Sequence, residues 1–255
     1  MFNPIIYYAV VGAMMVLSVV VFFALQRITA GYGMMYNKKW GPSVSNRIGW
    51  IMMETPAFVG MLLMWLLSEH RGNPALIVMA SLFELHYFQR SFIFPLAMRG
   101  KSRMPLAIIA SGALFNIINV YMIGGWLFHV GSAYYSSSWL MSPLFILGTV
   151  IFFAGMGINL HSDNIIRHLR MPGDTRHYIP RGGMYNYVTS ANYFGETLEW
   201  LGYAVLSWNI GSLAFLMWTF ANLAPRAKKL HSRYVSEFGN EYKSLNRKYI
   251  IPFIY

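Results

Sequence analysis

Long apolar stretches alternate with short polar segments along almost the whole chain. Crossing the roughly 30 Å hydrocarbon core of a bilayer takes about 20 mostly apolar residues in a helix. Seven stretches approach that length, namely residues 3–26, 49–68, 75–97, 104–130, 140–161, 190–208 and 210–225. The pattern therefore predicts an all-α, polytopic integral membrane protein with seven transmembrane helices.

The first and the last two stretches are less regular than the others. The first is too long for the apolar core of a signal peptide and is not followed by a small-residue cleavage site, so we expect it to be a retained span. Glu196, Glu199 and Asn222 interrupt the last two stretches, and only residues 209–211 separate them. Six spans is therefore the alternative count.

Basic residues gather in every second connecting segment. Eighteen of the 20 Lys and Arg residues lie in loops 27–48, 98–103 and 162–189 and in the tail 226–255. Since Lys and Arg accumulate on the cytoplasmic side, we expect the N-terminus outside and the C-terminus in the cytoplasm. The Pro- and Gly-rich loop 162–189 and the tail would then form a cytoplasmic cap. Contact with anionic lipid explains the net charge of +11, and no nucleic-acid partner is expected.

The composition agrees with a membrane protein. Hydrophobic residues make up 56% of the 255 residues and charged residues 11%, against roughly a quarter charged in soluble domains. We expect a single membrane domain over residues 1–255, and a monomer. Because the chain has no Cys and no zinc-type His pair, no metal is expected. The lack of Cys favours a bacterial inner membrane, or the endoplasmic reticulum if the source is eukaryotic.

Several ionisable residues lie inside the predicted spans. A charge at bilayer depth costs about 2.5–3.5 kcal/mol on insertion scales, so such groups usually face the interior of the bundle. The simplest interpretation of Glu84, His86 and Arg90 is that they are interhelical ties that satisfy one another. This interpretation covers Glu54 less easily, because Glu54 lies in another span, just before Pro56, which should bend or end its helix.

Glu54 and Tyr87 form a candidate catalytic pair. A carboxyl group in apolar surroundings tends to stay protonated and can then donate a hydrogen bond beside a Tyr hydroxyl. Two neutral donors aimed at one carbonyl oxygen would stabilise the charge of an enolate as it develops.

A polar stripe crosses the boundary of the fifth predicted span. Asn159, Asp163, Arg167 and Arg170 are spaced i, i+4, i+8 and i+11, which places them on one helix face. A ligand with a polar ring at one end and phosphates at the other would match this stripe, because Arg binds phosphate well. The alternative is an Asp163–Arg167 pair with interfacial arginines. The basic, aromatic tail is likewise compatible with phosphate contact or with an amphipathic helix lying on the membrane.

Longer strings of the chain resemble the steroid 5α-reductase family. The resemblance runs from Gly31-Tyr32-Gly33 to the terminal residues 251–255 and is densest between Gly155 and Tyr203. It implies a seven-helix membrane fold and NADPH as cofactor. It also implies a 3-oxo-5α-steroid 4-dehydrogenase activity, in which hydride is transferred to the β-carbon of a Δ4-3-oxo steroid and the α-carbon is then protonated.

The resemblance also implies site residues. In the family a Glu and a Tyr hold the substrate ketone, and these positions match Glu54 and Tyr87. The family's cofactor positions match Asn159, Asp163, Arg167, Arg170, Asn192, Glu196, Tyr32, Arg226 and Tyr234. A sterol pocket among the first four spans would include Trp50, Met53 and Phe115.

The chain departs from the family in two places. Met53 stands before Glu54 where relatives have Gln, and Glu241-Tyr242-Lys243 lacks the Pro that relatives have there. Met53 leaves open the reduction of another lipid enone or enoyl group. A methyltransferase that uses S-adenosylmethionine and a sterol-binding or transport protein are the alternatives from other classes.

Overall fold

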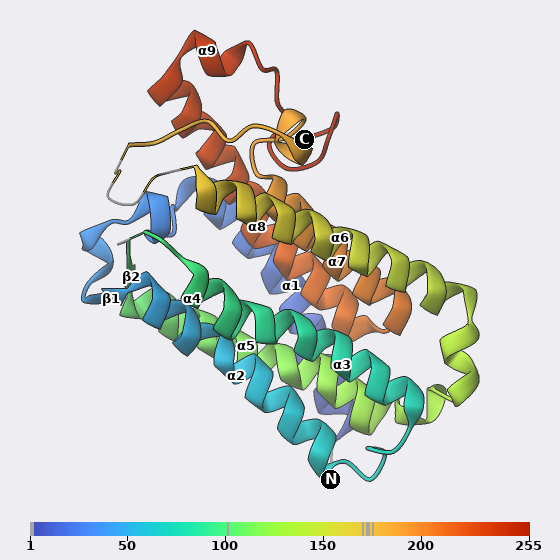
Figure 1. The fold of residues 1–255 in the computed structure, drawn as a ribbon. Helices are drawn as coiled ribbons and strands as arrows, with labels where there is room; N and C mark the ends of the chain where they lie inside the picture. Colours follow the sequence, from blue (N-terminus) through green and yellow to red (C-terminus); the bar gives the residue numbers. More distant parts are fainter. Residues whose placement is uncertain (1–2, 101, 170, 172–173, 175) are drawn as a thin grey trace.

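Helices dominate the fold, which a computed structural model describes for residues 3–100, 102–169, 171, 174 and 176–255. In Figure 1, α6, α7 and α8 lie on one side of the bundle and α2, α3 and α5 on the other, while α1 packs on α8 and also reaches α5. The helices are α1 (Pro4–Arg27), α2 (Asn46–Leu67), α3 (Pro74–Phe88), α4 (Phe94–Ala97), α5 (Leu106–Gly125), α6 (Pro143–His168), α7 (Ala191–Ser207), α8 (Ile210–Phe238) and α9 (Asn240–Lys243).

The same local signal starts three of the long helices. An Asn or Ser side chain accepts hydrogen bonds from the first free backbone N–H groups, and the next residue is a proline, whose fixed φ suits the first helical position. The pairs are Asn3-Pro4 for α1, Asn73-Pro74 for α3 and Ser142-Pro143 for α6.

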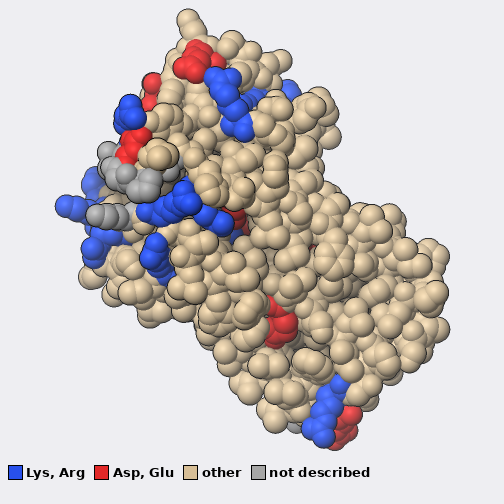
Figure 2. All heavy atoms as spheres, viewed as in Figure 1, with Lys and Arg blue, Asp and Glu red and all other residues tan. Residues whose placement is uncertain are grey.

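All seven predicted apolar stretches are helical. The third consists of α3, a π-helical segment (Gln89–Ile93) and α4, and the fourth consists of α5 with a π-helical extension (Trp126–Val130). Among the described residues, α1, α2, α5 with its extension, and α6 are long and apolar enough to cross a membrane. Figure 2 shows the charged side chains concentrated toward one end of the visible face, with few in the middle. These features support an integral membrane protein.

α2 does not end at Pro56 but continues to Leu67, because packed neighbouring helices can compensate for one missing backbone donor. α6 continues beyond residue 161 to His168, as the polar stripe on one helix face predicts. The first part of the tail is helical as well, and it is continuous with the last apolar helix, because α8 runs through Pro225 to Phe238.

Residues 176–190 and 226–255 pack together at one end of the bundle, and we call them the cap (Figure 1). Thr189 N donates to Lys248 O at 2.8 Å, and Lys248 N donates to Tyr187 O at 2.9 Å. At the same end, the short antiparallel strands β1 (Ser43–Ser45) and β2 (Arg103–Pro105) pair with Val44 opposite Met104. This pairing fixes the starts of α2 and α5 beside each other.

The backbones of α6 and α7 are in direct contact. A Cβ atom added at Gly155 would meet the backbone of Glu199, and one added at Gly195 would meet the backbone of Asn159. Gly148 and Gly202 approach the opposite helix in the same way, so only glycine allows this distance between the two axes. The polar residues of α6 are thereby held against those of α7.

Replacing Gly155 with valine should lower the stability of the protein by about 1–3 kcal/mol or more, because the added methyl groups force the two backbones apart. The measurement is the melting temperature of the purified protein in detergent. Gly157→Val is the matched control, since a Cβ atom at Gly157 meets nothing within 4 Å. Equal melting temperatures for the two variants would contradict the backbone contact.

Candidate functional site

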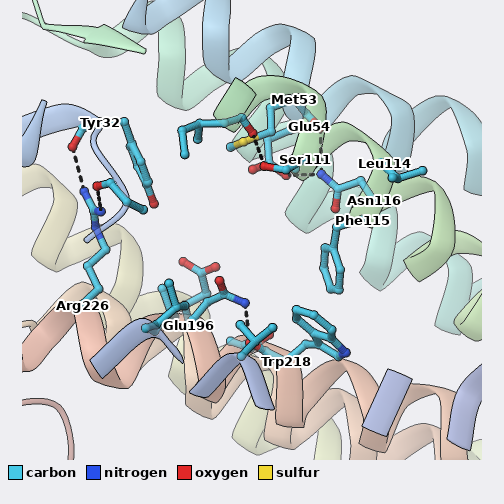
Figure 3. A pocket seen from close by; sticks show the side chains of 18 of the residues that line it. Tyr32, Met53, Glu54, Ser111, Leu114, Phe115, Asn116, Glu196, Trp218 and Arg226 are labelled. Carbon is cyan, nitrogen blue, oxygen red and sulfur yellow. Dashed lines mark hydrogen bonds between the residues drawn. The ribbon is translucent and has the colours of Figure 1, made fainter. Parts of the chain in front are cut away.

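A cavity of about 520 Å³ lies between α1, α2, α3, α5, α7 and α8 (Figure 3). Small-molecule pockets usually measure about 300–1,000 Å³. Most of the lining is apolar, and the ionisable groups come from both sides of the bundle. The predicted site residues that line it are Tyr32, Trp50, Met53, Glu54, Tyr87, Phe115, Glu196 and Arg226.

Glu54 on α2 and Tyr87 on α3 are brought together by a third residue. Tyr87 Oη donates to Asn116 Oδ1 at 3.2 Å, and Asn116 Nδ2 donates to Glu54 Oε2 at 3.0 Å. Figure 3 shows Glu54 and Asn116 side by side at the cavity wall. The candidate pair therefore faces one cavity and belongs to one hydrogen-bond chain.

Asn116 and Asn119 on α5 belong to this hydrogen-bond chain, and neither was predicted from the sequence. Asn116 is 4% exposed and Asn119 is 0% exposed. Asn119 Nδ2 donates to Tyr87 Oη at 3.0 Å, so both amides contact the same phenol. The available signal was their i, i+3 spacing inside an apolar span, where an amide needs an interhelical partner.

The residues predicted for the substrate lie at different parts of the wall. The Trp50 ring centroid is 4.6 Å from the Arg90 guanidinium carbon, and the Phe115 ring centroid is 4.9 Å from that of Trp218. The Met53 side chain fills the space that Gly112 leaves on α5. The cavity thus has one end near a buried cation and one end that is aromatic and apolar.

Arg90 and His86 tie α3 and its π-helical extension to the opposite side of the bundle. Arg90 Nη2 lies 3.4 Å from Glu196 Oε2, and Arg90 Nη1 lies 3.8 Å from Asp163 Oδ2. His86 Nδ1 lies 2.9 Å from Glu199 Oε1. His86 and Arg90 form interhelical contacts, as predicted, but the expectation that Glu84, His86 and Arg90 pair with one another is wrong. The three side chains leave the helix in different directions, so His86 and Arg90 pair with acidic residues of α6 and α7. Glu84 takes part in neither of these ion pairs.

The polar stripe on α6 meets α7 across the glycine contact. Asn159 Nδ2 donates to Asn192 O at 2.9 Å, and Asn192 Nδ2 donates to Asp163 Oδ1 at 3.0 Å. Asp163 contacts Arg90 and Asn192, so the alternative of a simple Asp163–Arg167 pair does not describe it. These side chains lie behind Glu196 and Arg90 and are not part of the cavity lining. Arg167 is half-buried, and Arg170 lies outside the described residues.

Tyr32 and Arg226 pack against each other at the cap end of the cavity (Figure 3). The Arg226 guanidinium carbon is 3.8 Å from the Tyr32 ring centroid, and Arg226 Nη2 donates to Tyr32 O at 3.0 Å. Arg226 Nε also donates to the hydroxyl of Tyr193 at 2.9 Å. This arrangement places a planar cation and the aromatic ring of Tyr32 at the cavity wall.

Tyr234 lies in the cap, away from the cavity lining. Its ring centroid is 5.1 Å from that of Tyr242, and it packs with Ile179. Nearby, burial lowers the pKa of His231, whose Nδ1 lies 2.7 Å from Thr189 Oγ1. The lowered pKa favours the neutral imidazole, which serves as a hydrogen-bonding group of the cap.

Several polar side chains of the cap are buried, among them Tyr185, Ser190 and Arg247. Arg247 interacts with the Tyr242 side chain, and its guanidinium carbon lies 5.7 Å from the centroid of the Tyr242 ring. These residues hold the cap together and do not line the cavity. In the sequence, Arg247 is one of the basic residues of the tail, and no spacing distinguishes it from the others.

Comparisons with known proteins give a consistent result. The sequence profile of the 3-oxo-5-alpha-steroid 4-dehydrogenase family matches residues 102–255. The chain is 37% identical over 237 residues to the steroid 5-alpha-reductase DET2 of Arabidopsis thaliana, covering 91% of this chain and 90% of the relative. It is 41% identical over 215 residues to the human 3-oxo-5-alpha-steroid 4-dehydrogenase 1, covering 83% of this chain and 81% of the relative.

Proposed function

Because the chain belongs to the 3-oxo-5-alpha-steroid 4-dehydrogenase family, we propose that it reduces the Δ4 double bond of a 3-oxo steroid with NADPH. Membership makes it an oxidoreductase acting on CH–CH bonds, and such enzymes point to a nicotinamide cofactor. The observation that carries the proposal is the Glu54–Asn116–Tyr87 chain at the wall of an apolar cavity. An apolar steroid with one ketone matches such a cavity.

Glu54 and Tyr87 would act on the ketone oxygen. When bound, a nicotinamide cofactor supplies a hydride to the β-carbon of the enone. The negative charge then develops on the substrate oxygen, where the neutral carboxyl of Glu54 and the Tyr87 hydroxyl donate hydrogen bonds. These donors bind the enolate more strongly than the ketone, which is what accelerates the step. Protonation of the α-carbon completes the reduction.

The cofactor would be held by groups on both sides of the glycine contact and in the cap. Its polar ring suits the Glu196 carboxyl at the cavity wall. Asn159, Asp163 and Asn192, which lie behind Glu196 and Arg90, would contact the ring only if the cofactor displaced part of their present contacts. Its phosphates suit arginines, because guanidinium groups bind them in bidentate fashion. The arginines concerned would be Arg167, Arg170 and Arg226. Tyr32 would add a stacking surface, and we place Tyr234 in the cap that encloses the phosphates.

The same proposal includes the topology. The seven helical stretches would each cross the bilayer, as one domain, with the N-terminus outside and the C-terminus in the cytoplasm. The two ends of the chain lie at opposite ends of the bundle (Figure 1), and the basic residues gather toward the cap (Figure 2). Both features suit seven crossings and a cytoplasmic cap. We further propose a monomer in a bacterial inner membrane.

Product analysis of the purified protein tests the proposal. We expect testosterone or progesterone to give the 5α-dihydro product with NADPH, and more slowly with NADH. Absence of product from several Δ4-3-oxo steroids would contradict steroid reduction. Product from another lipid enone alone would identify the alternative substrate class. Co-purified S-adenosylmethionine, or steroid transfer without NADPH oxidation, would indicate the other two functions.

A further inference from the structure

One backbone carbonyl determines the direction of every hydrogen bond in the Glu54–Asn116–Tyr87 chain. Asn116 Nδ2 lies 2.8 Å from Met53 O, which can only accept a hydrogen bond. The amide nitrogen of Asn116 must therefore face α2, and its oxygen must face Tyr87. The amide orientation follows from this contact, although nitrogen and oxygen of an amide are otherwise hard to distinguish.

The orientation of Asn116 also determines where the proton of Tyr87 points. Asn116 Oδ1 can only accept, so Tyr87 Oη is the donor across their 3.2 Å contact. Asn119 Nδ2 donates to the same phenol oxygen at 3.0 Å. Tyr87 thus donates its single proton to α5 and accepts a hydrogen bond from α5 at the same time.

The same amide determines which oxygen of the Glu54 carboxyl accepts a hydrogen bond and which one can donate. Asn116 Nδ2 donates to Glu54 Oε2 at 3.0 Å, so Oε2 is an acceptor. In a protonated carboxyl the carbonyl oxygen is the stronger acceptor, so this contact favours Oε2 as the carbonyl oxygen and Oε1 as the oxygen that carries the proton. The acid is left with one oxygen that can donate to a substrate.

We propose that Asn116 is a positioning residue that sets the hydrogen-bond direction of both Glu54 and Tyr87. It keeps the Tyr87 proton in place until the oxygen of a bound substrate takes over as acceptor, and it leaves Glu54 Oε1 as the donating oxygen. This inference rests on the proposed function, because it assumes a carbonyl substrate at Glu54 and Tyr87. In this role the amide acts through Glu54 and Tyr87, although Asn116 also lines the cavity.

Two substitutions test the role of the amide. Asn116→Leu keeps the size of the side chain and removes both hydrogen-bonding atoms, while Asn116→Asp keeps an acceptor for Tyr87 and loses the donor to Met53 O. We expect kcat to fall about 100-fold in Asn116→Leu, with KM within a few-fold of wild type, because small misplacements of catalytic groups have effects of this order. Asn116→Asp should also lower kcat. Ile117→Ala is the control, since Ile117 is on the same helix and 57% exposed, and it should leave kcat unchanged.

An infrared measurement separates positioning from packing and does not need turnover. The carbonyl band of the Glu54 acid, assigned by its loss in Glu54→Gln, should shift in both Asn116 variants and stay in place in Ile117→Ala. Wild-type kcat and an unshifted band in Asn116→Leu and Asn116→Asp would overturn the inference. Absence of steroid reduction by the wild-type protein would overturn the proposed function instead, and the band would still test the contact between Asn116 and Glu54.

Discussion

Replacing Glu54 with alanine should lower steroid turnover about 1,000-fold, because removing one donor to a developing oxyanion typically lowers kcat by about 100- to 1,000-fold. The substitution also removes the acceptor of Asn116 Nδ2 and so disturbs the contact to Tyr87. The measurement is the rate of 5α-dihydrosteroid formation at saturating steroid and NADPH. Cofactor affinity, measured by titration, should change little.

A milder substitution and a control define the role of the Glu54 carboxyl. Glu54→Gln keeps the size and one donor, yet turnover should still fall strongly, because an amide is a weaker donor than a carboxylic acid. Glu84→Gln is the control, since Glu84 also lies inside an apolar helix but does not line the cavity. Turnover should be unchanged in Glu84→Gln. Wild-type turnover in Glu54→Ala would remove Glu54 from the mechanism.

Replacing Arg90 with leucine should lower the stability of the protein by about 3–5 kcal/mol, because it leaves the partners of a buried ion pair uncompensated. Arg90 is 8% exposed and lies between Glu196 and Asp163, which would then face each other without a cation. The measurement is the denaturant or thermal unfolding midpoint in detergent.

An exposed ion pair serves as the control for Arg90→Leu. Arg176 pairs with Asp174 at 2.9 Å, but its side chain is 77% exposed, so Arg176→Leu should change stability by at most about 1 kcal/mol. Adding Asp163→Asn and Glu196→Gln to Arg90→Leu should restore part of the lost stability. An unfolding midpoint equal to that of Arg176→Leu would show that Arg90 does not hold α6 and α7 to the rest of the bundle.

The helical stretches were predictable because bilayer thickness dictates their length, and apolar composition marks them in the sequence. Their ends were less predictable. α6 and α8 continue as helices beyond their apolar residues. A hydropathy pattern marks only the apolar part of such a helix, so it does not show where the helix ends. The residue spacing indicated a helix in the tail, but not that this helix is continuous with the last apolar helix.

The relative positions of candidate site residues were predictable where these residues lie on the same helix. The i, i+4 spacing placed Asn159 and Asp163 on one face of α6, as the structure has them. Their partner Asn192 depends on how closely α7 approaches, which is a property of four glycines on two helices. Asn116 went unnoticed because its importance arises from contacts to α2 and α3, and neither contact leaves a spacing in the sequence.

The glycine contact between α6 and α7 also means that side-chain substitutions can reshape one part of the site but not the part beside this contact. Main-chain atoms set the separation of the two helices there, so exchanging side chains offers no gradual adjustment of the end that we propose to hold the cofactor. Other parts of the cavity wall are built from side chains of α1 and α5, such as Leu17, Ile108 and Leu114, which can be enlarged or trimmed individually. Engineering or natural divergence toward new substrates would accordingly accumulate on α1 and α5.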